Sequence, residues 1–300
     1  MRIIHIPLVL GLLLAGLACL SYISGQEPKA PAEESLESLR GRAEKGDVAA
    51  QVQLGVIYYN GQGVPQDYAE AVRWYRKAAD QGDAIAQTYL GVVNEQGRGV
   101  LRDYVEAVRW YRKAAEQGFA DAQSALGVMY EMGRGAPQDN VEAHMWMNLA
   151  AARARDAEQG EYARSRDSLG QQMNPQEIAE AQRRAREWML KAGTTPASES
   201  LRSLRARADA GDATAQSDLG LMYEMGIEVL QDYVEAHMWM NLAAARANGK
   251  LRASVVNLRD ELFGKMTPDQ IAEAQRRARE WKPKIAQQPK APLSKTPTKK

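Results

Sequence analysis

A 36-residue unit recurs along the chain, and this repeat constrains the fold more than any other feature. Gly46, Gly82 and Gly118 lie 36 residues apart, and the same register aligns Ala-Gln, Leu-Gly and Trp at equivalent places. A fourth copy begins at Gly211. A fixed period of this length is typical of solenoids, in which each unit contacts only its neighbours. The predicted repeats are residues 46–81, 82–117, 118–153 and 211–246.

Each unit is predicted to form two helices. In the first unit Ala50, Leu54 and Tyr58 recur every four residues, and Ala71 and Trp74 belong to a second run with helical spacing. An Asp before the second helix, followed three residues later by Glu, is typical of a capping box. Glycines between the helices turn the chain. Because a helix pair cannot bury its apolar face alone, the units must stack.

The combination of Ala-Gln, Leu-Gly, Gly-x-Gly, Asp-Tyr-x-Glu-Ala and Trp-Tyr at this spacing resembles the Sel1-like repeat family, a relative of the tetratricopeptide repeats. The resemblance covers residues 46–151 and 211–244. It implies an all-α fold, a right-handed α-solenoid of helix-turn-helix repeats with capping helices. Two residues depart from the pattern: Asn94 replaces a tyrosine, and Glu228 replaces the second glycine of the fourth loop. The second change bears on the conformation of that loop and leaves the predicted fold unchanged.

A longer duplication extends the third and fourth repeats. Val141–Ala154 recurs unchanged at Val234–Ala247, and Ile178–Trp188 recurs at Ile271–Trp281, both at an offset of 93 residues. Each extension is expected to hold two helices, the last of which begins with a proline behind an N-cap residue. In the family that the chain resembles, such a segment closes the exposed end of the stack.

These features divide the chain into two arrays, each preceded by an opening helix. The first array spans residues 27–192 and holds three repeats, and the second spans residues 200–282 and holds one. A linker at 193–199 joins them, and residues 283–300, rich in Pro and Lys, are predicted to be a disordered tail. Since about three repeats are needed for a stable solenoid, the short array is predicted to dock on the long one.

The N-terminal residues have the features of an export segment. Leu8 to Leu20 is an apolar run of thirteen residues behind Arg2, and no acidic residue precedes Glu27. A run of this length fits a secretory signal better than a membrane span. Residues 1–26 are either removed or kept as an anchor. In both cases the remainder is expected to be exported, to the periplasm or beyond.

No catalytic, cofactor-binding or metal-binding residue is predicted. The one cysteine, Cys19, lies in the export segment, and His144 and His237 occupy a position that is valine in the first repeat, Val72. Exchange with valine favours packing over a ligand or general-base role. The Gly-x-Gly pairs lie between helices and do not follow a strand, so they lack the context of a phosphate loop. The 39 basic and 38 acidic side chains nearly cancel, which disfavours nucleic acid as a partner.

The sequence therefore predicts a non-catalytic scaffold or adaptor that binds a protein or peptide in the bacterial envelope or extracellular space. The first helices of such repeats line a concave groove, and positions that vary between copies within a fixed framework are the candidate contacts. They are Gln53, Tyr59, Thr88, Tyr89, Glu95, Ser124, Glu131, Met132, Ser217, Asp218 and Glu224.

The sequence leaves two alternative functions open. An envelope structural protein would use the lysine-rich tail to touch peptidoglycan or anionic lipid weakly. A β-lactam-binding or β-lactam-hydrolysing relative would carry paired cysteines and a nucleophile motif, and this chain lacks both.

Overall fold

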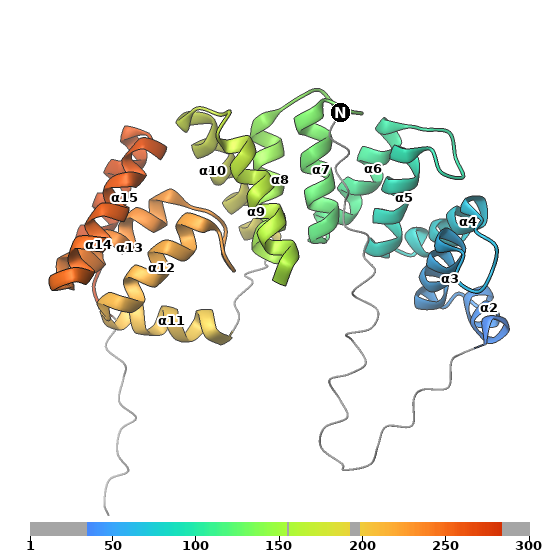
Figure 1. Cartoon of the computed structure of the whole chain (residues 1–300), viewed down its shortest axis with the longest axis horizontal. Coiled ribbons are helices and arrows are strands. Elements are labelled where there is room, and N and C mark those ends of the chain that lie inside the picture. The colour runs from blue at the N-terminus through green and yellow to red at the C-terminus, as the bar shows by residue number, and fades with distance from the viewer. Residues whose placement is uncertain (1–34, 155, 193–198, 284–300) are drawn as a thin grey trace, which may run out of the picture.

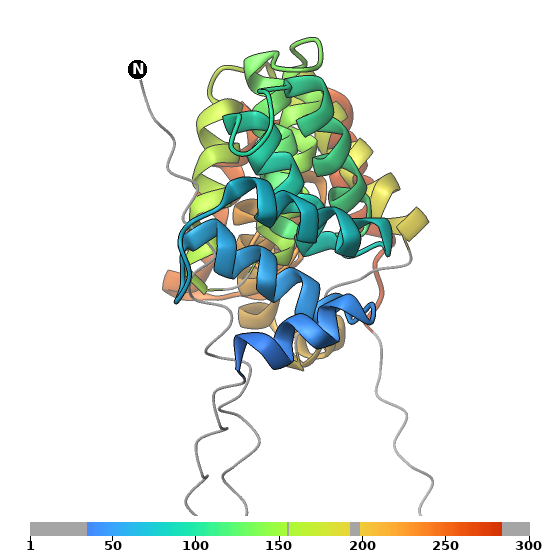
Figure 2. The same ribbon diagram turned by 90° about the vertical axis from the view of Figure 1, so that its right-hand side faces the viewer.

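The described part of the molecule is a curved stack of helices. The computed structural model describes residues 35–154, 156–192 and 199–283, and within these ranges the chain contains helices and no strand. The helices follow one another along an arch from α2 to α15 (Figure 1). With the first repeat facing the viewer, later units lie behind it (Figure 2). The all-α solenoid predicted from the repeats is confirmed, whereas the export segment and most of the linker and tail lie outside the described residues.

Helices come in the predicted pairs. The first array contains α2 (Leu36–Glu44), α3 (Val48–Asn60), α4 (Tyr68–Asp80), α5 (Ala84–Gln96), α6 (Tyr104–Glu116), α7 (Ala120–Met132) and α8 (Asn140–Arg153). Its extension consists of α9 (Asp156–Gly170) and α10 (Pro175–Ala192), which both pack on α8. The second array contains α11 (Glu199–Ala210), α12 (Ala213–Met225), α13 (Tyr233–Arg246), α14 (Gly249–Glu261), a short 3-10 helix (Leu262–Lys265) and α15 (Pro268–Glu280).

The Asp-x-x-Glu pairs cap the second helices by a different arrangement from the predicted capping box. The Asp67 side chain accepts from the Glu70 amide at 3.0 Å, as an N-cap should. The Glu70 carboxylate, however, accepts from the indole N–H of Trp74 at 2.9 Å instead of returning to the cap. The aspartate therefore starts the helix and the glutamate fixes the tryptophan. Reciprocal boxes do form at the last helix of each extension, at Asn174 and at Thr267.

The loop glycines show where one repeat lies against another. A Cβ added at Gly135 would come 2.1 Å from the carbonyl oxygen of Tyr104 in the preceding repeat. Gly63 is in the first repeat of its array, and a Cβ there would meet nothing within 4 Å. Glu228 occupies the corresponding place in the second array and adopts the same left-handed backbone, with a φ of 56°. The turn therefore survives this substitution, because the second glycine is required only inside a stack.

The core is shared unequally among the units. One cluster of buried side chains extends from Ala107 in the second repeat to Ala274 in the last helix. The first repeat contributes to two smaller clusters, around Tyr75 and around Trp74. Burial of small alanines beside large aromatic rings gives close helix packing.

Candidate protein-binding surfaces

The predicted contact residues on the first helices differ widely in exposure. Gln53, Met132 and Asp218 are exposed, whereas Thr88, Tyr89, Glu95, Ser124, Glu131 and Glu224 are half-buried and Tyr59 and Ser217 are buried. Among these residues a ring contact joins Tyr59 and Tyr89. Variation between copies thus marks several residues that have little surface to offer a partner.

Tyr59 belongs to the contact between the first two repeats. It is 4 % exposed, and its ring lies 5.2 Å from that of Tyr68 and 5.9 Å from that of Tyr89, centroid to centroid. Its hydroxyl accepts from Arg98 at 2.7 Å and donates to Gln96 at 3.3 Å. Burial raises the pKa of Tyr59, and Arg98 opposes that change. This tyrosine holds two units together.

Other predicted contacts already have partners within the molecule. The Tyr89 ring stacks on that of Tyr75, with centroids 4.7 Å apart and planes 3° apart. Glu95 accepts from the Tyr111 hydroxyl at 2.8 Å, and Glu224 pairs with Lys265 at 2.8 Å.

The remaining candidates are surface residues with fewer contacts within the molecule. Glu131 is half-buried, and its carboxylate makes no hydrogen bond or ion pair with the described residues. Burial raises the pKa of Glu131, because a desolvated carboxylate favours its neutral form. With Gln53, Met132 and Asp218 it forms the part of the predicted set that is open to a ligand.

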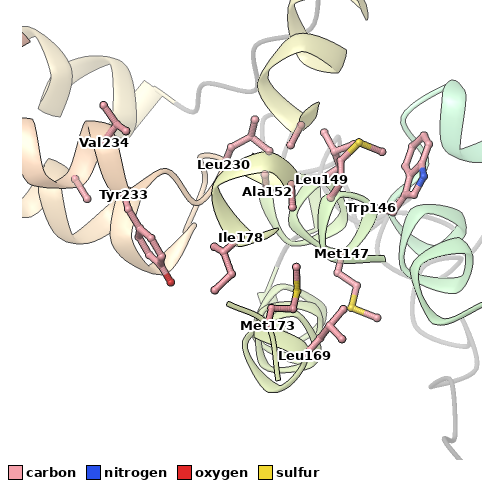
Figure 3. Packing of buried hydrophobic residues seen from close by; sticks show 14 of the residues in the cluster. Trp146, Met147, Leu149, Ala152, Leu169, Met173, Ile178, Leu230, Tyr233 and Val234 are labelled. Carbon is pink, nitrogen blue, oxygen red and sulfur yellow. The ribbon is translucent and has the colours of Figure 1, made fainter. Parts of the chain in front are cut away.

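A second surface arises where the two arrays meet, and its apolar part is shared between them. Leu230 and Tyr233 of the second array are buried in the same cluster as Ile178 of α10 and Leu149 of α8 (Figure 3). The short array therefore docks on the long one, as the single repeat predicted. The first extension is consequently the docking surface for the next array and does not end the stack.

Polar groups fix the geometry of this joint. The side chain of Asn148 donates to the Gln231 carbonyl at 3.1 Å and accepts from the Gln231 amide at 2.9 Å. Fully buried Arg166 donates to the Met225 carbonyl at 2.7 Å. Arg186 on α10 pairs with Asp232 at 2.8 Å. These bonds satisfy backbone groups of the second array that would otherwise be buried without partners.

The single repeat of the second array predicted that the arrays dock, but it did not identify the residues that make the contact. Asn148, Arg166 and Arg186 have identical counterparts 93 positions later, at Asn241, Arg259 and Arg279. A signal that could have identified the contact surface is the Gln-Asp-Tyr sequence, which follows the loop in the first repeat of each array.

A groove of about 760 Å³ opens beside the joint. Its apolar wall is formed by side chains of α10, α11 and the loop before α13, namely Met189, Leu190, Leu201, Val229 and Leu230. Leu190 is 80 % exposed and adds apolar surface to this wall. Charged side chains of both signs stand at the rim, among them Arg202 and Asp209. An apolar wall with a charged rim is typical of a peptide-binding surface.

The histidines are packing residues. His144 and His237 are both 1 % exposed. Burial, followed by the charge of Arg166, lowers the pKa of His144 to about 3. Burial likewise lowers the pKa of His237 to about 4. Both imidazoles are therefore neutral near pH 7, as expected of the position that is valine in other repeats.

The described residues contain neither a cluster of metal ligands nor a membrane-spanning helix. Within these parts of the chain no group of three or more His, Cys, Asp or Glu side chains is arranged to hold a metal ion. None of the helices described combines the length and apolar character that crossing a membrane requires.

The stacked helix pairs define an α-solenoid repeat protein, and sequence comparison identifies the family. The model of the Sel1 repeat matches residues 48–83, 84–119, 120–154, 178–194 and 213–248, more than half of the chain. The chain belongs to the Sel1 repeat family, whose members generally mediate protein–protein interactions. Four matches correspond to the four predicted repeats. The short fifth match starts on α10, so part of the first extension is itself repeat-like.

Solved Sel1 repeat structures are similar in sequence to parts of the chain. The protective antigen c5321 of uropathogenic Escherichia coli strains, described as displaying an SLR fold, is 33 % identical over 81 % of this chain, with a TM-score of 0.43. This chain spans 48 % of that protein. A Sel1 repeat protein from Oxalobacter formigenes is 41 % identical over 42 % of this chain and 96 % of its own, with a TM-score of 0.38.

A third structure, from Klebsiella pneumoniae subsp. pneumoniae, is described as a putative sel1 repeat protein. It is 20 % identical over 75 % of this chain and 97 % of its own, with a TM-score of 0.35. No curated protein sequence matches the chain.

Proposed function

We propose that the chain is an exported, non-catalytic adaptor that binds a segment of another protein in the groove beside the joint. The observation that carries this proposal is the exposed Leu190 above an apolar wall contributed by both arrays. Apolar side chains exposed around a concave surface favour binding, because a partner removes them from water.

The chemistry of the rim favours a particular kind of segment. Arg186 is paired with Asp232, and Arg205 donates to the Tyr223 hydroxyl at 2.7 Å. Arg202 is exposed at the same rim and has no partner among the described residues. An apolar side chain on the partner would enter the groove, and a neighbouring carboxylate would pair with Arg202. The proposed occupant is a peptide segment with an apolar anchor flanked by an acidic residue.

A photo-crosslinking amino acid at position 190 tests this proposal in the native cell. The matched control places the same amino acid at Leu101, which is 92 % exposed but lies outside the groove. We expect a defined protein adduct from position 190 and none from position 101. Equal labelling at both positions, or none at position 190, would contradict the groove as the binding site.

A binding measurement with the captured protein then tests the chemistry. Leu190→Asp and Arg202→Glu should each weaken binding by roughly tenfold or more, because each removes one part of the recognition. Leu101→Asp should leave the affinity unchanged. Both leucines are exposed, so neither substitution should alter the fold.

Export and the absence of catalysis are parts of the same proposal. The apolar run at Leu8 to Leu20 behind Arg2 supports export. Fractionation of cells and N-terminal sequencing of the recovered chain would test it; recovery in the cytoplasm with residue 1 intact would contradict it. For catalysis, we expect no turnover of a chromogenic β-lactam and no labelling by a fluorescent penicillin.

A further inference from the structure

The joint between the arrays has two complementary sides, which we name the seat and the head. The seat consists of Asn148, Arg166, Gln182 and Arg186 on α8, α9 and α10. The head consists of Gln231 and Asp232, which end the loop before α13, and Tyr233, the first residue of α13. Beyond the bonds of Asn148 and Arg186, the side chain of Gln182 accepts from the Tyr233 amide at 3.4 Å. Each element of the head thus meets a group of the seat.

The same seat recurs, uncovered, at the C-terminal end of the stack. Its residues are identical in type at an offset of 93 positions, namely Asn241, Arg259, Gln275 and Arg279. Gln275 and Arg279 are exposed, whereas Gln182 in the joint is fully buried. Ala152 is buried beneath the docked array, and its counterpart Ala245 is exposed. The last extension therefore presents the surface that the first extension uses to hold an array.

The same head recurs, also uncovered, at the N-terminal end. Gln66, Asp67 and Tyr68 repeat the Gln-Asp-Tyr of the joint, behind an opening helix of the same pattern. The side chain of Gln66 donates to the Tyr59 carbonyl at 2.7 Å, as that of Gln231 donates to the Glu224 carbonyl at 3.0 Å. The local conformation is thus the same in both copies.

Asp67 shows that this head is free. Its counterpart Asp232 is 2 % exposed and pairs with Arg186, whereas Asp67 is exposed. Among the described residues the Asp67 carboxylate accepts one hydrogen bond, from the amide of Glu70, so its other oxygen is open to a cation.

Where the free ends differ from the joint, the differences are complementary in charge. Met189 of α10 and Arg202 of α11 line the same groove beside the joint. The corresponding residues at the free ends are Lys282 after α15 and Glu37 on α2. A lysine and a glutamate would therefore face one another if a free head entered a free seat, and opposite charges favour that pairing.

We propose that the free head of one copy of this chain docks in the free seat of another copy, in the arrangement of the internal joint. The two surfaces lie at opposite ends of the arch, near α4 and near α14 and α15 (Figure 1). Contact between two different surfaces is heterologous, so each added copy leaves one head and one seat free. The product is a head-to-tail chain of solenoids. Its central ion pair joins Arg279 of one copy to Asp67 of the next.

Sedimentation of the full chain over a range of concentrations gives the first measurement. We expect the average mass to rise without reaching a fixed plateau as the concentration approaches about 100 µM. A constant monomer mass over that range would overturn the proposal. This assay contains no other protein, so it is independent of the proposed adaptor function.

Charge reversal identifies the surfaces. Asp67→Arg and Arg279→Glu should each raise the dissociation constant at least tenfold, and the double variant should regain association because the ion pair is restored in reverse. A fold defect could not produce this recovery. The matched controls are Asp103→Arg, the equivalent cap in the second repeat, and Lys250→Glu, at the other end of α14 from Arg259. Association that is insensitive to the single changes, equally weakened by the controls, or not regained by the double variant would refute the arrangement.

Discussion

The joint and the C-terminal end of the molecule are built from the same residues and differ in what covers them. Both Arg166 and its counterpart Arg259 pair with the aspartate that follows them, but Arg166 has a side-chain exposure of 0 % and also bonds to the backbone of the second array, whereas Arg259 is 26 % exposed. Asn148 holds Gln231, and Asn241 instead contacts His237 on its own helix. In a linear stack, therefore, the energetic role of a residue depends on whether a unit follows it.

The loop glycines should give the largest difference between a covered and an uncovered copy. Gly135 and Gly63 have nearly equal φ angles of 71° and 72°, so alanine is strained similarly at both. Gly63→Ala should lower the free energy of unfolding by about 1 kcal/mol from the left-handed backbone alone. Gly135→Ala must also push away the Tyr104 carbonyl and should cost about 4 kcal/mol. Denaturant titration measures both, and equal losses would contradict the packing of consecutive loops.

The second largest difference in unfolding free energy is expected between Arg166 and Arg259. Arg166→Ala should lower the free energy of unfolding by about 3 kcal/mol, since it removes a fully buried side chain together with its bond to the Met225 carbonyl. Arg259→Ala should cost less than about 0.5 kcal/mol, because an exposed pair contributes little. Both variants are compared by denaturant titration at low protein concentration, which excludes self-association. A loss at Arg259 as large as that at Arg166 would refute the comparison.

The asparagines sharpen the same comparison at a single hydrogen-bonding group. Asn148→Ala should cost about 2 kcal/mol, because both the amide and the carbonyl of Gln231 lose their partner inside the joint. Asn241→Ala should cost less than about 1 kcal/mol, since its contact is to a side chain on the same helix. Thermal unfolding of the two variants, at matched concentration, ranks them directly.

An effect of similar size concerns pH and the buried histidine beside the joint. The pKa of His144 is lowered to about 3, below its ordinary value near 6.5, so the unfolded chain binds a proton that the folded chain refuses. Stability contributed by the neutral imidazole is therefore present above about pH 6.5 and is lost as the pH falls toward 3. Between pH 7.5 and pH 5 this loss should be about 2 kcal/mol.

His144→Val tests that assignment with a residue that the other repeats already use at this position. The variant should keep its stability at pH 7.5 within about 1 kcal/mol and should lose the acid sensitivity of this one site. The free energy of unfolding of the variant and of the parent chain is measured at pH 7.5, 6.5, 5.5 and 5. The difference between them isolates the histidine, because the carboxylates contribute equally to both. His237→Val is the matched comparison, and its change should be nearly as large, because burial also lowers the pKa of His237, to about 4.

The fold was predictable from the sequence because local and long-range signals agree. The period of 36 residues places the helix pairs, the aspartates mark their starts, and the glycines mark their turns. The role of Glu70 was not predictable in this way. Its position fits a capping box, but in the folded helix its carboxylate accepts a hydrogen bond from the indole of Trp74.

The binding surfaces were less predictable, for physical reasons. The partners of Tyr59, Arg98 and Tyr68, belong to one particular contact between repeats, so this position differs between copies. From the sequence alone, such a difference cannot be told from that of a ligand-binding position. The groove beside the joint combines α10 with α11, and the repeat period does not indicate which side chains of the two arrays come together there. The identity of Asn148 with Asn241 likewise hides the difference in their surroundings.

The unequal division of the core has a consequence for the order in which the molecule is made. The main cluster reaches from Ala107 to Ala274, so a ribosome must finish nearly the whole chain before that cluster can close. Because each unit contacts only its neighbours, the first repeats can pack their small clusters early, while the main cluster stays incomplete until α15 is added. Loosely held intermediates of this kind can still be threaded through a narrow channel or held by a chaperone, and they become resistant to proteases when α15 is added.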